Sequence, residues 1–269
     1  MLNPIGGGGG GPVIRRHLGS QELTASGAWL KADALALPYL ATLSASDLLA
    51  VVVDIECVGG GGGGQSDYSS GGGGFPGAVN ARSFNLSNIL GDVAVTVGDG
   101  GAAQATGGTT SFGSHVVAAG GFSGSSISNA NLAIAYSLVS ASRSIRRVPP
   151  AFFTLVSRRD SVDGPGGGGN ATGTTSNYVD GGYSAPGTQN EVTGGLGKYN
   201  STSGQDNNGQ PGGNAPGVWS YGGGGGGTRN SGLSGGAGGT PGGGGGAGGI
   251  GGAGGRGAIR LHYYIWSRP

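Results

Sequence analysis

The stretch LLAVVVDIECVGGGGGG, residues 48–64, joins two kinds of sequence with different structural requirements. Its first part is typical of a largely buried strand ending at Val58, because its apolar residues are nearly continuous. Its second part is six consecutive glycines, which have no side chains to bury. Glycine costs about 0.5–1 kcal/mol relative to alanine inside a helix or strand, so neither element gains from such a run. The stretch therefore predicts a strand that leads directly into an unusual backbone structure.

This glycine run is one of several blocks spread along the chain. The sequence has 69 glycines in 269 residues. The blocks lie at residues 6–11, 59–64, 71–74, 166–169, 222–227 and 242–246. Polyglycine II shares the threefold helix of polyproline II, with a rise of about 3.1 Å per residue and no internal hydrogen bonds. Its N–H and C=O groups need partners, which neighbouring glycine helices can supply. The blocks therefore predict a bundle of polyglycine II helices.

Apolar segments between the blocks argue against a collagen helix and against a flexible linker. Collagen requires glycine at every third residue with abundant proline, whereas this chain has contiguous glycines and 12 prolines. A linker would lack strand-like segments. These segments lie at residues 51–55, 93–97, 152–156 and 259–266. We predict a mainly β protein with little α-helix, in which short β-sheets anchor the glycine-helix bundle.

The chain is expected to have an N-terminal arm, residues 1–22, and one glycine-rich domain, residues 23–269. An apolar and basic insertion interrupts the domain at residues 128–163. The net charge of +1 gives no electrostatic footprint for nucleic acid. The first residues lack the pattern of a signal peptide, and charged and proline residues interrupt the apolar stretch at 34–53. We expect a soluble protein made in the cytoplasm, without a transmembrane segment.

Five motifs follow one another along the chain, namely TASGAW (24–29), the strand that runs into glycines 59–64, VTVGDGG (95–101), TSFG (110–113) and the terminal segment 251–263. Together and in this order they resemble the glycine-rich domains of bacteriophage tail proteins. The resemblance covers most of residues 23–264 and departs from the family at a longer connection, residues 31–46, and at the insertion.

The resemblance implies a non-enzymatic virion protein of a tail fibre or tail tip, which forms a homo-oligomer, expected to be a trimer. A capsid decoration or other minor virion protein is the alternative. A glycine-rich structural or ice-binding protein would share the glycine helices but should lack the ordered motifs.

The sequence contains no convincing catalytic or metal-binding pattern. Gly-x-Gly-x-x-Gly matches lack the strand, helix and acidic residue of a dinucleotide site, and the three histidines are too dispersed to suggest a zinc site. Asp54 and Glu56 are expected to be solvated charges at a strand edge, and Cys57 to be a buried, unreactive thiol. We expect no catalytic residue, metal or cofactor.

Two segments have side chains suited to recognition. Residues 170–221 combine small polar residues with aromatic ones, as antibody loops do. The receptor-binding candidates, directed to a host surface glycan or outer-membrane protein, are Tyr178, Tyr183, Tyr199, Trp219 and Tyr221. The insertion combines apolar residues with arginines, which are enriched at interfaces. Its candidates for docking to other virion proteins are Arg143, Arg146, Arg147, Phe152, Phe153, Arg158 and Arg159. The alternatives are aromatics that pack on the bundle and an insertion that forms a solvated hairpin.

Overall fold

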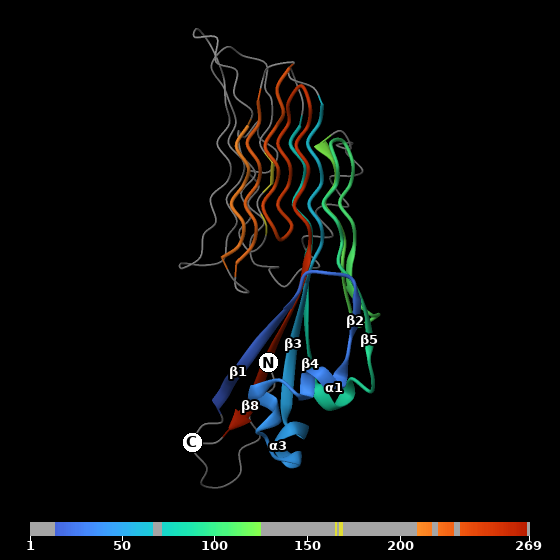
Figure 1. The fold of residues 1–269 in the computed structure, drawn as a ribbon, viewed down its shortest axis with the longest axis vertical. Helices are drawn as coiled ribbons and strands as arrows, with labels where there is room; N and C mark the ends of the chain where they lie inside the picture. The colour runs from blue at the N-terminus through green and yellow to red at the C-terminus, as the bar shows by residue number, and fades with distance from the viewer. Residues whose placement is uncertain are drawn as a thin grey trace, which may run out of the picture.

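The computed structural model consists of a β-sheet part and, continuing from one end of it, a set of parallel and antiparallel extended segments (Figure 1). The structure describes residues 14–66, 72–124, 165, 167–168, 209–216, 220–228 and 232–267. The elements are β1 (Ile14–Leu23), β2 (Gly27–Trp29), α1 (Lys31–Leu35), α2 (Pro38–Ala41), α3 (Ala45–Leu49), β3 (Val51–Val58), β4 (Val79–Asn85), the 3-10 helix η1 (Leu86–Asn88), β5 (Val93–Thr96), β6 (Thr110–Phe112), β7 (Val116–Ala118) and β8 (Ala258–Ser267). The predicted mainly β fold is confirmed.

Two four-stranded antiparallel sheets make up the β part. Sheet A has the strand order β1-β8-β3-β4, and sheet B has the order β2-β5-β6-β7. One face of sheet A packs on sheet B in a shared core. The strand-like segment expected near the C-terminus is part of β8, and its Ile259, Leu261 and Tyr263 are fully buried in this core. The residues between them therefore lie on the opposite face of sheet A.

Three short helices, α1 to α3, form the connection from β2 to β3 at the end of the sheets away from the glycine segments (Figure 1). Ala34 and Leu40 of these helices are buried. Ser44 caps α3, because its Oγ accepts a hydrogen bond from the Asp47 amide at 3.1 Å. The expected strand at residues 48–58 therefore begins only at Val51, after α3 ends. No helix within the described ranges is long and apolar enough to cross a membrane.

The glycine segment 59–64 continues from β3 and lies at the centre of the bundle. Its N–H groups donate at 2.8–3.0 Å to three neighbouring segments in turn, and every third residue returns to the same segment. These acceptor segments are 75–78, 105–108 and 252–255. Carbonyl groups of residues 60–65 accept from three further segments, namely 101–104, 121–124 and 245–248. A hydrogen-bonding period of three with six neighbours is the arrangement expected of polyglycine II.

The six neighbours also bond to one another, which closes a ring around the central segment. For example, Gly108 donates to Asp99, Gly254 to Gly101, and Gly255 to Gly243. A second layer lies outside this ring. It contains segments 209–215, 222–228 and 235–239, which bond to each other and to residues 242–253. The predicted bundle of mutually bonded glycine helices is therefore present in the described residues.

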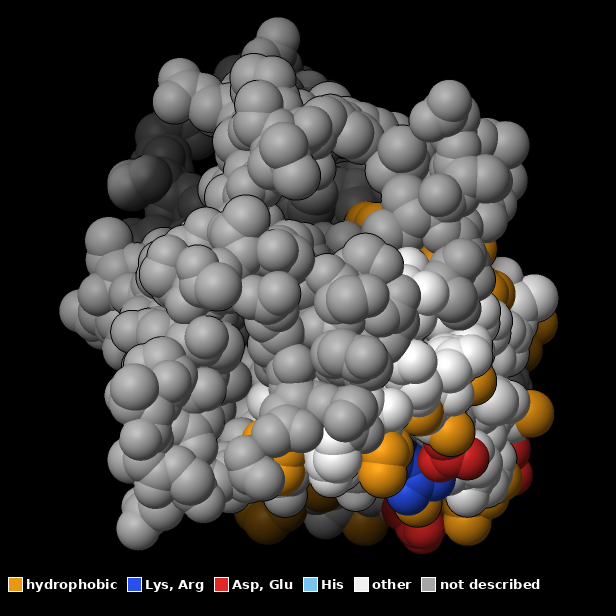
Figure 2. Space-filling model, turned by 90° about the horizontal axis from the view of Figure 1, so that it is seen from above, with side chains coloured by type: hydrophobic (Ala, Val, Ile, Leu, Met, Phe, Trp, Pro, Cys, Tyr) orange, Lys and Arg blue, Asp and Glu red, His pale blue; other side chains and the backbone are white. Residues whose placement is uncertain are grey.

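On two neighbouring segments of the ring, exposed side chains recur at every third residue. Ile250, Ala253 and Arg256 are exposed along one segment, and Asp99 and Ala102 along its neighbour. Seen from the bundle end, the described surface in Figure 2 is largely white, which marks backbone and side chains that are neither hydrophobic nor charged, with scattered apolar groups and few charged ones. A threefold helix packed on one side leaves only one residue per turn free to carry a side chain.

The expected arm includes residues 14–22, which belong to β1 and pair with β8, so this part is integrated into sheet A. The insertion, including the strand-like segment 152–156, lies outside the described residues.

Candidate functional site: the charged face of sheet A

The face of sheet A that points away from sheet B is polar. Strand register places Glu22 of β1 and Glu56 of β3 on either side of Arg260 of β8. Two residues further along β8, Ser20 and Asp54 lie on either side of His262. Because directly opposite residues of neighbouring strands share a face, three strands bring these charges together.

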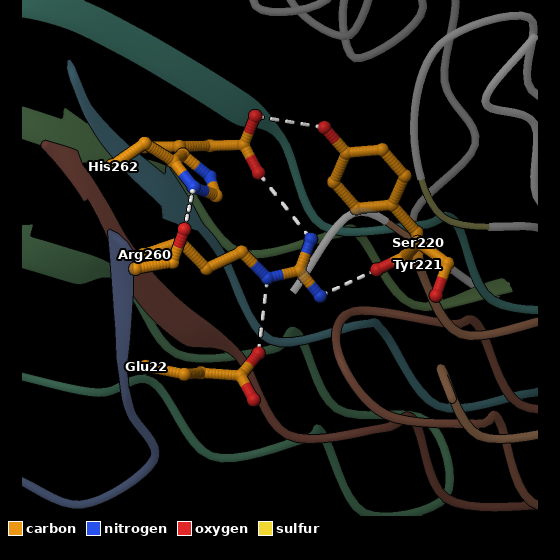
Figure 3. Close-up of polar contacts among 7 residues, drawn as sticks. Glu22, Ser220, Tyr221, Arg260 and His262 are labelled. Carbon is orange, nitrogen blue, oxygen red and sulfur yellow. Dashed lines mark hydrogen bonds and ion pairs between the residues drawn. The ribbon is translucent and has the colours of Figure 1, made fainter. Parts of the chain in front are cut away.

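Arg260 is the centre of an ion-pair cluster, which we define as Glu22, Glu56, Ser220, Tyr221 and Arg260 (Figure 3). The Arg260 side chain is fully buried. Its Nε lies 3.0 Å from Glu22 Oε1, and its Nη1 lies 3.4 Å from Glu56 Oε1. Two carboxylates thus face one desolvated cation, which is the condition under which a buried arginine is tolerated.

The same cluster attaches a glycine helix to the sheet. Arg260 Nη2 donates to the Ser220 carbonyl, and the Tyr221 hydroxyl donates to Glu56 Oε2 at 2.8 Å. The Tyr221 ring centroid lies 5.1 Å from the Arg260 guanidinium carbon, within range of a cation–π contact. Residue 222 then begins the glycine segment of the outer layer. The cluster therefore fixes where this segment starts relative to strands β1, β3 and β8.

A second polar group links two histidines through one serine. Ser20 Oγ lies 2.7 Å from His262 Nδ1 and 3.0 Å from His17 Nε2. A serine bonded to histidine is a component of nucleophilic sites, in which a carboxylate orients the histidine. Asp54 is in register with His262, but its Oδ1 accepts from Arg15 at 2.8 Å and from Ser83. This carboxylate oxygen therefore connects β1, β3 and β4.

Aromatic rings extend this face towards the chain ends. The Arg15 guanidinium lies 3.8 Å from the Tyr264 ring centroid and 6.0 Å from that of Trp266. Trp266 is 52% exposed. Arg15 also forms the ion pair with Asp54. The arginine is thus oriented by both a charge and a ring.

The expectation that Asp54 and Glu56 are solvated edge charges is wrong. Asp54 is only 6% exposed, and β3 is an inner strand of sheet A. Both carboxylates pair with arginines on β1 and β8. These two strands come from opposite ends of the chain, so their pairing leaves no signal in the local sequence around β3.

Cys57 is buried, as expected from the sequence. Its Sγ faces the Val116 carbonyl oxygen at 3.5 Å. Burial raises the pKa of the Cys57 thiol from 9.0 to about 12. The neutral thiol is therefore the form present at physiological pH, which makes the side chain a poor nucleophile.

Of the predicted receptor-binding residues, Tyr221 alone lies within the described ranges. It is half-buried, and its hydroxyl bonds to Glu56 next to the sheet. The other four aromatic candidates and all seven docking candidates of the insertion lie outside the described residues. Sequence reasoning missed Arg260, because its partners are distant in sequence. Within the described ranges, no group of three or more His, Cys, Asp or Glu side chains is arranged to hold a metal ion.

A family model described as a glycine-rich domain matches residues 45–264. The match begins in α3 and ends in β8, so it spans the whole described glycine bundle together with strands β3 to β7. No curated protein gives a significant match to the chain.

Proposed function

The chain belongs to the glycine-rich domain family, and on that premise we propose that it is a non-enzymatic structural protein of a bacteriophage virion. We place it in a tail fibre or tail tip, where it contributes to host attachment after synthesis in the host cytoplasm. The order of the five motifs supports the phage assignment. The homo-oligomer remains a prediction, and its trimeric copy number is an expectation that comes from the resemblance alone.

The observation that carries the proposal is the six-neighbour packing around residues 59–64. Interior helices of this kind carry no side chains and cannot provide specificity themselves. A bundle anchored on a sheet can instead serve as a rigid support, with recognition assigned to the segments that connect its helices. This division of roles suits an attachment protein.

Recognition is assigned to four of the five aromatic candidates, Tyr178, Tyr183, Tyr199 and Trp219. Tyr221 is left out because its hydroxyl is engaged by Glu56 and its ring lies over Arg260. The arginine-rich insertion is the proposed contact with other virion proteins, because its apolar and basic composition suits an interface.

Alanine substitution at Tyr183 or Trp219 should reduce adsorption to host cells while particle assembly continues. Loss of an interface hot spot costs about 2 kcal/mol, which corresponds to roughly thirtyfold in affinity. Tyr221→Phe is the matched control, since it removes an internal hydrogen bond and should leave adsorption unchanged. Unchanged adsorption in both alanine variants would contradict the recognition assignment.

Gold-labelled antibodies on intact particles would locate the protein. Labelling of the tail is expected. Labelling spread over the capsid would favour the alternative, a decoration or other minor virion protein. Detection in infected cells but not on particles would contradict the virion assignment as a whole.

A further inference from the structure

Strand β1 is an edge strand of sheet A, and its second edge is open among the described residues. It runs for ten residues and pairs with β8 on one side. Figure 1 shows β1 along the outer side of the β part, with no labelled element beyond it. An exposed edge presents unpaired N–H and C=O groups and can pair with a strand of another chain.

The charges along β1 are unequally distributed. The first half contains Arg15, Arg16 and His17, and the second half contains Ser20, Gln21 and Glu22. An antiparallel copy of the same strand would therefore place a basic half against a half with acidic and neutral polar residues. Such opposite-charge pairs across strands are favourable, whereas like charges directly opposite are not.

We propose that β1 pairs antiparallel with β1 of a second copy, around a twofold axis that passes between Leu18 and Gly19. The register of β1 on β8 defines which residues share a face. Arg16 and Gln21 lie opposite Ile265 and Leu261, on the core side of sheet A, whereas Arg15 and Glu22 lie opposite Trp266 and Arg260, on the charged face.

In the proposed register, each residue lies opposite the residue of the second copy whose number brings the sum to 37. Core-side residues then lie opposite core-side residues, and charged-face residues opposite charged-face residues. It sets Arg15 opposite Glu22 of the second copy, Arg16 opposite Gln21, and His17 opposite Ser20. A register shifted by one residue would bring core-side residues opposite charged-face residues. The register irregularity between His17 and Gly19 lies at the axis, where it interrupts neither half of the ladder.

This register also continues the existing ion pairs across the interface. Arg15 is paired with Asp54, and Glu22 with Arg260. When Arg15 lies next to Glu22 of the second copy, the pair Asp54–Arg15 of one chain continues into the pair Glu22–Arg260 of the other. Acidic and basic side chains then alternate across the interface. The edge is thereby covered by a self-complementary contact of the kind that a twofold axis requires.

The inference does not depend on where the protein functions. It predicts pairs of chains, in place of the trimer expected from the sequence. Sedimentation equilibrium of the purified full chain should give the mass of a dimer. A monomer at all concentrations, or a trimer, would overturn the proposal.

A charge-swap series tests the register itself. Gln21→Arg places an arginine opposite Arg16 at two symmetric positions and should weaken dimerisation by about tenfold. The double variant R16E/Q21R restores opposite charges at both positions and should recover most of the affinity. Thr96→Arg, which adds the same charge at an exposed position of β5, is the control and should leave dimerisation unchanged.

Because Q21R is present in both variants, a general loss of folding cannot explain recovery in the double variant. Equal dimerisation of wild type and Gln21→Arg would overturn the register. A double variant as weak as Gln21→Arg would overturn it as well.

Discussion

The glycines of this protein fall into two classes, according to whether a Cβ atom would fit at the position. A Cβ at Gly61 would lie 2.0 Å from the carbonyl oxygen of Gly243, and one at Gly63 would lie 1.8 Å from that of Ala102. At Gly91, in the turn before β5, a Cβ would meet nothing within 4 Å. The bundle therefore requires glycine because backbones touch there, whereas the turn has room for a side chain.

Gly61→Ala should destabilise the fold strongly, and Gly91→Ala should not. The first substitution forces two hydrogen-bonded backbones apart, for which we expect about 3 kcal/mol or more, at the upper end of overpacking costs. The second should stay within about 1 kcal/mol of wild type and can be stabilising, since alanine restricts the unfolded chain. Urea unfolding measures both. Similar stabilities of the two variants would show that the close contacts around Gly61 are not present.

Cys57 should make stability depend on pH in alkaline solution. The unfolded thiol ionises near 9.0, but burial holds the pKa of the folded thiol at about 12. Its contribution is therefore complete below about pH 9 and falls by about 1.4 kcal/mol per pH unit as the pH rises towards the folded value. The measurement is urea unfolding of wild type and Cys57→Ala from about pH 8 to about pH 11.

Other ionisations are common to both proteins, so the difference in stability isolates the thiol. We expect the cost of Cys57→Ala to be constant below the unfolded pKa and to shrink above it. A cost that stays constant across the whole range would contradict the burial of the thiol.

At the scale of elements, the connections between the sheet and the bundle determine the geometry. β3 leads directly into the central glycine segment, and β8 follows directly from one of that segment's neighbours. The sheet pairing of β3 with β8 thus continues as hydrogen bonding between segments 59–64 and 252–255. Within the part of the chain that the structure describes, segment 222–228 does not continue from a strand of either sheet, and the Arg260 cluster supplies its attachment instead.

Arg260→Met should therefore cost far more than Arg256→Met. Removing the buried guanidinium leaves Glu22 and Glu56 without their cation, and because these two side chains are 30% and 17% exposed we expect a loss at the lower end of the roughly 3–5 kcal/mol typical of fully buried pairs. Arg256 forms an ion pair of 3.2 Å with Asp99, but the two side chains are 45% and 85% exposed. Breaking an exposed pair costs at most about 1 kcal/mol. Thermal and urea unfolding of the two variants would check the contrast, and equal losses would rule out the anchoring role of Arg260.

At the scale of the whole molecule, the parts that sequence could predict are those with local periodicity. Glycine blocks predicted the bundle, and the apolar segments at 51–55 and 259–266 predicted strands that the structure has in β3 and β8. The pairing of β1 with β8 joins residues near opposite ends of the chain, and local patterns carry no information about it. The Arg260 cluster depends on that pairing and on the position of Tyr221, so it could not be predicted for the same reason.

The central claim is that residues 59–64 form the interior helix of a hydrogen-bonded glycine bundle. Amide hydrogen exchange, resolved for each residue by NMR with ¹⁵N-labelled glycine, tests it most directly. The account predicts that these six amides exchange as slowly as those of β3, because all six glycines are buried and each of their N–H groups donates to a backbone carbonyl. Exchange at the rate of an exposed loop, with β3 still protected, would contradict it.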